Sequence, residues 1–148
     1  MKTVRHILEA KGSEVYTIGP DASVLEALGR LAEKDVGALV VTGSDGRIVG
    51  MLSERDYARK VALVHRVSRD TPVRDIMTQE VICVAPEQTV ETCMALMTRK
   101  RFRHLPVVVD GRLAGLVSIG DVVKTLMDEQ QFAIQQLEHY IMGGVGGR

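Results

Sequence analysis

One seven-residue pattern occurs twice in this chain, and the repeat restricts the possible folds more than any other feature. Residues 50–56 read Gly-Met-Leu-Ser-Glu-Arg-Asp and residues 115–121 read Gly-Leu-Val-Ser-Ile-Gly-Asp, so both follow the pattern G-x-x-S-x-x-D. Each copy closes an apolar run and opens a helical pattern. Because a single small unit buries its sheet poorly, an internal repeat indicates two similar units that stack and share a core.

The two copies are alike well beyond this motif, and each is predicted to form β-α-β-β-α. In the first copy, Ser23 is the expected N-cap of a helix from Val24, and Glu26 completes a capping box. In the second copy, Thr89 is the expected N-cap of a helix from Val90. The last two strands of each copy form a hairpin. The predicted strands are residues 15–20, 38–42 and 47–52 in the first copy and residues 81–86, 105–109 and 113–117 in the second.

This pattern predicts an α/β (α+β) fold in which the two repeats pack with pseudo-two-fold symmetry and a long C-terminal helix follows. A short helical turn is expected before each repeat, over residues 3–10 and again over residues 72–77, so the lead-in is duplicated as well. The expected segments are a lead-in helix at 1–14, the first repeat at 15–62, a linker at 63–80, the second repeat at 81–124, and a helix with a flexible glycine-rich tail at 125–148.

The C-terminal segment continues as a helix to about Met142, where Gly143 and Gly144 are expected to end it. Its apolar positions alternate steps of four and three, as in a coiled-coil seam. The helix could fold back on its own core or pack on a partner subunit. We favour the second alternative, and a homodimer, because the helix is longer than one domain of this size needs. The seam residues are Val123, Met127, Gln130, Ile134, Leu137 and Ile141.

Composition excludes several classes of protein. The 148 residues contain 19 basic and 19 acidic side chains, and this balance argues against a nonspecific nucleic-acid binder, which needs a basic excess. No apolar stretch approaches the length of a membrane span or a signal peptide, so we expect no membrane partner. The two cysteines form no disulfide framework, which favours a reducing, cytoplasmic location.

No catalytic or metal-binding constellation is visible. The histidines His6, His65, His104 and His139 are scattered without metal-ligand spacing. There is no nucleophile elbow and no phosphate-binding loop of the Walker type. The sequence therefore predicts a protein that is not an enzyme and binds no metal.

The repeated motif itself favours a ribose-containing ligand. A carboxylate can accept hydrogen bonds from two neighbouring hydroxyl groups at once, and such charge-assisted bonds are strong. Asp56 and Asp121 each lie in the first turn of a predicted helix, and Ser53 and Ser118 lie three residues before them at a strand end. Each serine could cap its helix or contact the ligand.

With both repeats placed, the chain resembles a tandem pair of cystathionine-β-synthase (CBS) domains, also called a Bateman module, of the small bacterial type. The family implies two clefts between the repeats that bind adenosine-containing ligands such as AMP, ADP, ATP, S-adenosylmethionine or NAD, and modules that pair into dimers. The matching residues are Thr17-Ile18-x-Pro20 with Gly50-x-x-Ser53-x-x-Asp56 in the first repeat, and Arg103-His104-Leu105-Pro106-Val107 with Gly115-x-x-Ser118-x-x-Asp121 in the second.

In the family, each cleft takes its ribose-binding aspartate from one repeat and its adenine-facing strand from the other. Carried over, the resemblance implies a nucleotide-binding cleft formed by Thr17, Ile18, Ala22, Val36, Gly37, Ala38, Ser118 and Asp121, with Arg103 and His104 for the phosphates. It implies a second cleft formed by Ser53, Arg55, Asp56, Cys83, Val84, Gln88 and Phe102, again beside Arg103 and His104. Because Cys83 and Gln88 replace Thr17 and Ala22 there, we expect the Asp121 cleft to bind more tightly.

The expected function is therefore a sensor that binds an adenine nucleotide (AMP, ADP, ATP or NAD) and signals its occupancy to a downstream protein that the sequence does not identify. Two alternatives remain open. One is a small nucleotide-processing enzyme, and the other is a dimerisation module with vestigial clefts.

Overall fold

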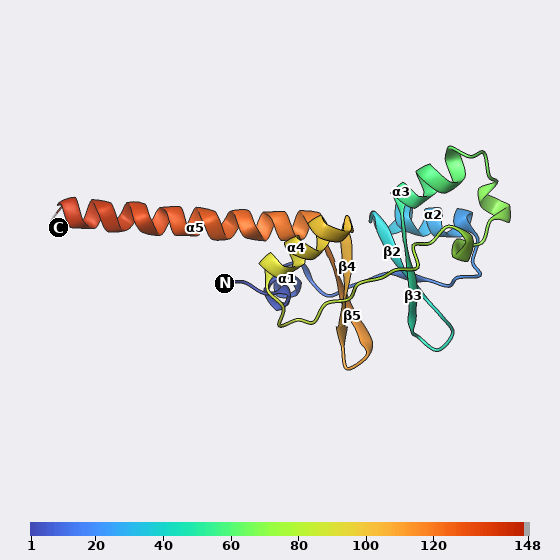
Figure 1. The fold of residues 1–148 in the computed structure, drawn as a ribbon, viewed down its shortest axis with the longest axis horizontal. Helices are drawn as coiled ribbons and strands as arrows, with labels where there is room; N and C mark the ends of the chain where they lie inside the picture. The colour runs from blue at the N-terminus through green and yellow to red at the C-terminus, as the bar shows by residue number, and fades with distance from the viewer. Residues whose placement is uncertain (147–148) are drawn as a thin grey trace.

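The computed structural model describes the backbone of residues 1–146 and the side chains of residues 1–142. Two small α/β units lie side by side, and one long helix projects from the second unit, away from the first (Figure 1). This arrangement confirms the predicted α+β class with its two repeats and its C-terminal helix.

The first repeat contains the β-α-β-β-α order expected from its sequence. Its sheet has the order β1-β2-β3, in which β1 pairs in parallel with β2 and β2 pairs in antiparallel with β3. The helix α2 begins after Ser23, whose hydroxyl accepts a hydrogen bond from the Glu26 backbone N–H at 3.0 Å. The elements are β1 (Thr17–Ile18), α2 (Val24–Lys34), β2 (Ala38–Thr42), β3 (Ile48–Ser53) and α3 (Glu54–Tyr57), which continues as a π-helical turn, η1 (Ala58–Ala62).

The second repeat consists of α4 (Val90–Lys100), β4 (His104–Val109), β5 (Arg112–Ser118) and α5 (Ile119–Gly146), and β4 pairs in antiparallel with β5. The strand predicted at residues 81–86 does not form, since only Val84 makes a single parallel bridge, to Val107. Pro106 explains the loss. In the first repeat Val40 donates its N–H to the Tyr16 carbonyl, but proline at the matching position has no N–H to donate.

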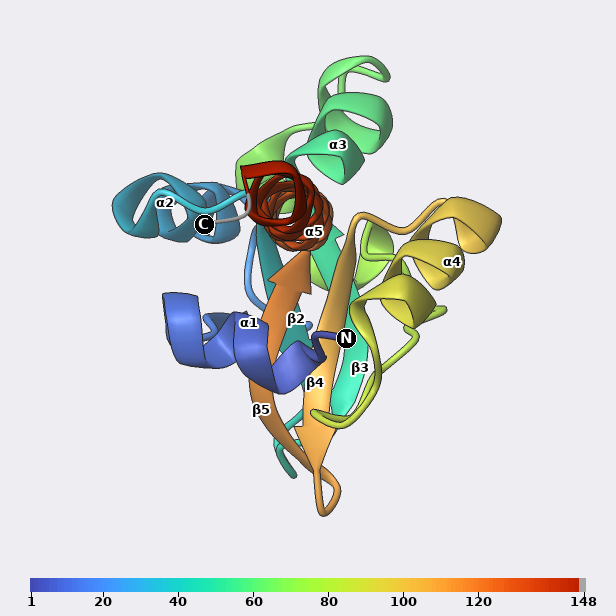
Figure 2. The same cartoon turned by 90° about the vertical axis from the view of Figure 1, so that its left-hand side faces the viewer.

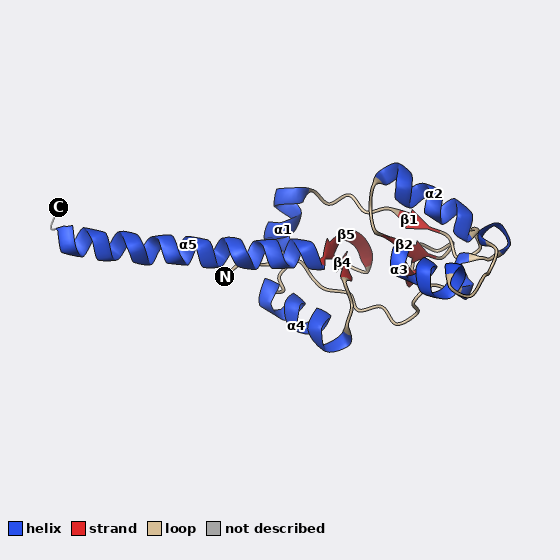
Figure 3. Ribbon diagram, turned by 90° about the horizontal axis from the view of Figure 1, so that it is seen from above, coloured by secondary structure: helices blue, strands red, loops and turns tan. Residues whose placement is uncertain are grey.

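The lead-in segments are exchanged between the repeats. The helix α1 (Val4–Lys11) precedes the first repeat but packs on the second, beside β5 and α5, as Figures 2 and 3 show. The backbone N–H groups of Val4 and Arg5 donate to the carbonyls of Gln88 and Pro86, both at 2.9 Å. The Lys2 carbonyl in turn accepts from the Val90 N–H at 3.0 Å, at the start of α4.

The linker repeats this contact on the other side of the molecule. It contains two 3₁₀ turns, η2 (Ser68–Asp70) and η3 (Val73–Asp75), where the helical turn after Pro72 was expected. The N–H groups of Val73 and Arg74 donate to the carbonyls of Ala22 and Pro20 at 2.8 and 2.9 Å. Each repeat is therefore completed by the segment that precedes the other repeat in the chain.

The core divides in the same way. Val4 and Ile7 of α1 are buried among the residues of the second repeat, and Val73 and Ile76 of the linker are buried among those of the first. A third, smaller cluster joins the two sheets. It contains the buried Ala38, Val40 and Met51, with Val15, Ile48, Val81, Leu113 and Leu116 packed against it. The two repeats are thus held together through the faces of their sheets.

The helix α5 begins inside the second repeat and leaves it. Val122 is fully buried and Leu126 packs on the core, but Leu137 is 63% exposed and Figure 1 shows the distal helix extending beyond the body. It does not fold back on its own core. The expected end at Gly143 is wrong, because the helix runs to Gly146. Glycine weakens a helix without forbidding helical dihedral angles. Of the predicted flexible tail, residues 147–148 lie outside the described part of the chain.

Candidate functional site

The first copy of the motif forms a reciprocal cap at the start of α3. The Ser53 hydroxyl accepts from the Asp56 N–H at 3.3 Å, and Asp56 Oδ2 accepts from the Ser53 N–H and hydroxyl at 3.0 and 3.1 Å. Asp56 Oδ1 accepts from the Thr78 hydroxyl at 3.2 Å and lies 3.2 Å from Lys60 Nζ. Because a carboxylate has about four acceptor positions, the protein itself occupies all those of Asp56.

The second copy has the same cap but a different counter-ion. Asp121 Oδ2 accepts from the Ser118 N–H at 2.8 Å and from Lys11 Nζ at 2.7 Å, and no hydrogen bond to Oδ1 is found in the described part of the chain. Burial is the largest influence on the pKa of Asp121 and raises it. The hydrogen bonds from Lys11 and Ser118 and the Lys11 charge outweigh burial, so the pKa lies below its usual value of 3.8. Asp121 is therefore ionised at neutral pH.

The glycine that opens each motif lies under an exchanged lead-in segment. A Cβ atom on Gly50 would lie 2.7 Å from Met77 Sδ and 2.9 Å from the Thr78 carbonyl oxygen. A Cβ atom on Gly115 would lie 2.9 Å from a methyl group of Leu8 in α1. The close approach of these segments brings Thr78 to Asp56 and Lys11 to Asp121.

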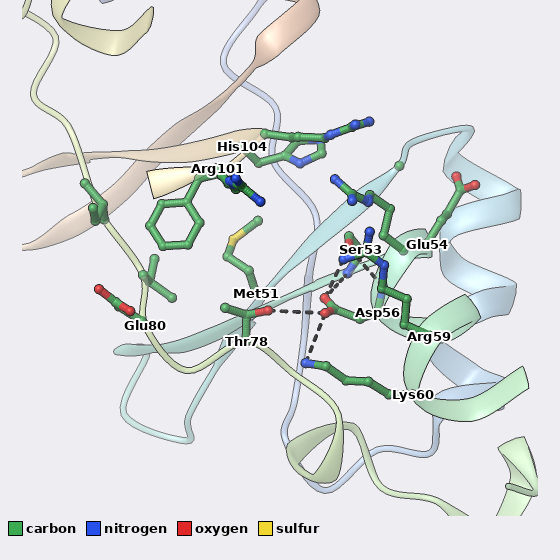
Figure 4. A pocket seen from close by; sticks show the side chains of 16 residues that line it. Met51, Ser53, Glu54, Asp56, Arg59, Lys60, Thr78, Glu80, Arg101 and His104 are labelled. Carbon is green, nitrogen blue, oxygen red and sulfur yellow. Dashed lines mark hydrogen bonds and ion pairs between the residues drawn. The ribbon is translucent and has the colours of Figure 1, made fainter. Parts of the chain in front are cut away.

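A cavity of about 500 Å³ lies between the repeats at the first motif (Figure 4). One wall comes from the first repeat and carries Ser53, Asp56 and Arg59. Residues 101–104, which lead from α4 into β4, form the facing wall, and linker residues, among them Thr78 and Glu80, complete it. Figure 4 shows Asp56 and Lys60 on one side of this space and Arg101 and His104 on the other. The volume is in the range of small-molecule sites.

The electrostatics of the cavity favour an anion. The Arg103 and Arg59 charges, in that order, lower the pKa of the Arg55 guanidinium, so like charges from both repeats face each other. Burial is the main cause that lowers the pKa of His104, and its imidazole is therefore neutral at pH 7. A neutral imidazole can either donate or accept a hydrogen bond.

The cavity combines residues that the sequence had assigned to different clefts. It brings Ser53, Arg55, Asp56 and Phe102 of the expected second cleft together with Gly37, Arg103 and His104. Cys83, Val84 and Gln88 do not line it. Val84 is buried in the core, and Gln88 Oε1 accepts from the Ala85 N–H at 2.7 Å. Cys83 is exposed, and partial burial raises the pKa of its thiol.

The remaining residues expected beside Asp121 do not belong to the cavity at Asp56. Ile18 and Ala38 are buried in the core, and the Thr17 carbonyl accepts a hydrogen bond from Arg30. Ala22 and Val36 pack against the core of the first repeat, and none of these five lines the cavity at Asp56. Ala38 is paired with Ser53 across the sheet, as His104 is paired with Ser118, so the two strand edges are equivalent by pseudo-symmetry. Their role as a cleft stays a prediction.

Sequence reasoning missed Lys11, Thr78, Glu80 and Arg101. Lys11 and Thr78 belong to segments outside the repeats that pack on the partner repeat, so no local pattern marked them. Among the described residues, no group of three or more histidine, cysteine, aspartate or glutamate side chains could hold a metal ion. Nor does any helix of the described chain have the length and apolar character needed to cross a membrane.

Several known proteins are similar to this chain in sequence and in fold. The profile of the CBS domain family matches residues 4–63 and 73–128. A mitochondrial CBS domain-containing protein of Arabidopsis thaliana, CBSX3, is 39% identical over 96% of this chain and 73% of its own length. A structure of a protein with CBS domains from Burkholderia ambifaria MC40-6, described as a signal-transduction protein, has a TM-score of 0.82 at 48% identity, covering 87% of this chain and 96% of its own.

A more distant structure shows the same fold with ligands bound. It is the CBS domain pair of protein MJ0100 in complex with 5-methylthioadenosine and S-adenosyl-L-methionine, with a TM-score of 0.75 at 24% identity, covering 87% of this chain and 98% of its own. The family profile covers most of the chain and accounts for both repeats together with their lead-in segments. The chain therefore belongs to the CBS domain family, as a tandem pair of CBS domains.

Proposed function

We propose that this module binds an adenosine-containing nucleotide (AMP, ADP, ATP or NAD) between its repeats and signals occupancy to a partner protein without catalysing a reaction. One observation carries the proposal, namely the cavity that joins Asp56 of the first repeat to Arg103 and His104 of the second. A ligand in this position contacts both repeats at once. Its binding therefore favours one relative arrangement of the repeats, as signalling requires.

The cavity has a surface for each part of a nucleotide. Met51, Val81, Ile82 and Phe102 supply apolar surface for an adenine ring. Asp56 supplies a carboxylate for the ribose hydroxyls, provided that Thr78 and Lys60 yield some of its acceptor positions. The arginines supply donors for phosphate. A CBS pair of the same fold holds two adenosine derivatives, which supports this class of ligand.

The second cleft is proposed at Asp121, with the residues expected from the sequence around it. We keep the prediction that this cleft binds the ribose more tightly. Support comes from Asp121 Oδ1, for which no hydrogen bond is found in the described chain, whereas both oxygens of Asp56 are occupied by the protein. A ribose hydroxyl can therefore reach Asp121 without displacing Lys11.

Calorimetry on the purified protein tests the function. Adenine nucleotides should bind, and guanine nucleotides should bind much more weakly. Loss of a charged acceptor costs roughly 1.5–3 kcal/mol, or about ten- to a hundredfold in affinity, so Asp121→Ala should weaken the tighter event by that factor. Asp56→Ala should weaken the other event. Chromatography of the same mixtures monitors turnover.

The alternatives give different results in this experiment. Clear turnover of AMP, ATP or NAD would establish a nucleotide-processing enzyme. A folded protein that binds no adenine nucleotide at millimolar concentration would establish a dimerisation module with vestigial clefts. If the affinities change in the opposite order in the two variants, the assignment of the tighter cleft is reversed.

We also propose a homodimer that pairs through the distal part of α5. Ile134, Leu137 and Ile141 follow the seam and are 49, 63 and 59% exposed. A helix of this kind gains most of its stability from packing, so its apolar stripe calls for a partner helix. Gln130 lies in the seam and Gln131 beside it, and both are uncharged, so the pairing of two identical helices brings no like charges together at these positions.

We further propose a reducing, cytoplasmic location, because Cys83 and Cys93 are free thiols.

A further inference from the structure

The cavity at Asp56 has a positive charge that the protein does not neutralise. Its lining contains five lysine and arginine side chains against three aspartate and glutamate side chains, an excess of two positive charges with His104 neutral. Lys60 and Asp56 neutralise each other as an ion pair. The unneutralised charge therefore belongs to arginines.

The arginines that contribute this charge come from both sides of the cleft. Arg55 lies in α3 and Arg59 in the following turn, both in the first repeat. Arg101 and Arg103 lie just before β4 in the second repeat. Within the described chain, none of the ion pairs involves any of these four side chains. Arg103 has the largest effect on the pKa of Arg55 and lowers it, so the guanidinium groups repel each other across the cleft.

Such an arrangement destabilises the empty module. Like charges at short range repel even where water screens them in part, and the repulsion here acts between the two repeats. An anion placed between the arginines would replace this repulsion with charge-assisted hydrogen bonds to both repeats. A phosphate monoester carries about 1.5 to 2 negative charges at pH 7, which matches the excess of two.

We propose that a phosphate group bound between Arg55 and Arg59 of the first repeat and Arg103 of the second acts as a counter-ion clasp, which draws together repeats that repel each other when the cavity is empty. The inference rests on the proposed function and specifies how the site is regulated. The cavity accordingly requires a phosphorylated adenosine ligand. It discriminates against an uncharged ligand such as methylthioadenosine and against a cationic ligand such as S-adenosylmethionine.

Three single variants test the clasp: Arg59→Gln, Arg103→Gln and, as a matched control, Arg99→Gln. Arg99 lies in the last turn of α4 and does not line the cavity. Urea unfolding of the unliganded proteins should show Arg59→Gln and Arg103→Gln to be more stable than the original chain, with Arg99→Gln unchanged. Sodium pyrophosphate, compared with sodium chloride at equal ionic strength, should stabilise the original chain and Arg99→Gln but have little effect on the other two.

Binding measurements separate the clasp from the proposed function. At the cavity, AMP should bind about ten- to a hundredfold more weakly to Arg59→Gln and Arg103→Gln, by the loss of a charged hydrogen bond. If AMP and methylthioadenosine bind equally well to the original chain, the adenosine site stands and the clasp is refuted. If pyrophosphate stabilises the protein and no adenosine ligand binds, the clasp stands and the proposed function is refuted. Arginine variants that are less stable than the original chain when unliganded would refute the clasp.

Discussion

Positions 50 and 115 require glycine because another segment of the chain lies directly over each of them and leaves no room for a side chain. The Thr78 carbonyl covers Gly50, and the Leu8 side chain covers Gly115. Neither glycine has a positive φ angle, so backbone freedom does not explain the choice. The first residue of the motif is thus determined by packing, whereas Ser53 and Asp56 are determined by the cap of the helix and by the cavity.

Alanine at these two positions should have unequal effects. In Gly50→Ala the new methyl group meets backbone at Thr78, which cannot move alone, and overpacking of this kind costs about 1–3 kcal/mol. In Gly115→Ala it meets the end of the Leu8 side chain, which can change rotamer, so the loss should be smaller. Urea unfolding of both variants measures the difference. Equal losses would show that α1 is held as rigidly as the linker.

The ion pair between Lys11 and Asp121 should make stability depend on pH. The pKa of Asp121 is depressed in the folded protein, so its contribution is complete above about pH 3.8 and is lost as the pH falls through the lower folded value. Lys11→Met should therefore cost about 0.5–1 kcal/mol at pH 7, since Lys11 is 37% exposed, and progressively less as the pH falls below 3.8 and Asp121 takes up a proton.

The exposed pair between Arg5 and Glu87 supplies the control for this measurement, because Arg5 also lies in α1 and both side chains of the pair are accessible to water. Arg5→Met should change the free energy of unfolding little over the same pH range. A loss in Lys11→Met that does not diminish as Asp121 is protonated would mean that the lysine acts through the packing of its aliphatic part. The sequence identified Asp121 as a candidate site residue. It did not identify the ion-pair partner Lys11, because the two residues are 110 positions apart in the chain.

At the scale of elements, the sequence predicted correctly the features that depend only on residues close together in the chain. The N-caps Ser23 and Thr89, the helices after them and the Asp110-Gly111 hairpin are all confirmed. The strand expected at 81–86 is reduced to one bridge because its neighbour, Pro106, has no N–H group. That failure could not be read from residues 81–86 themselves, because it depends on which strand lies beside them.

Charge on the seam of α5 should disrupt the proposed dimer. Ile134→Lys combined with Leu137→Lys places two positive charges of each subunit in the contact between the paired helices, where they repel the same charges of the other subunit. Light scattering should therefore give the mass of a monomer. Gln136→Lys combined with His139→Lys adds the same two lysines to the opposite side of the helix and should leave the dimer intact. A dimer that survives the seam variant must pair through the body of the module.

At the scale of the whole molecule, the sequence predicted two repeats and two lead-ins but not their exchange. Equivalent hydrogen bonds, from Val4 to Gln88 and from Val73 to Ala22, relate the two halves, so the pseudo-two-fold symmetry includes the lead-ins. The cavity at Asp56 depends on the same arrangement, since Thr78 reaches it from the linker. A pattern within one repeat contains no information on which repeat a preceding segment will cover.

The exchange means that the unit repeated in the sequence is not the unit that folds. Cleavage between residues 65 and 66 would give two fragments, and each would carry the lead-in that completes the other. Neither fragment should fold alone, since Val4 or Val73, both fully buried in the intact chain, would have no core to enter. Mixed in equal amounts, they should complement each other and recover the native circular dichroism and nucleotide binding. A fragment that folds cooperatively by itself would show that its lead-in is dispensable.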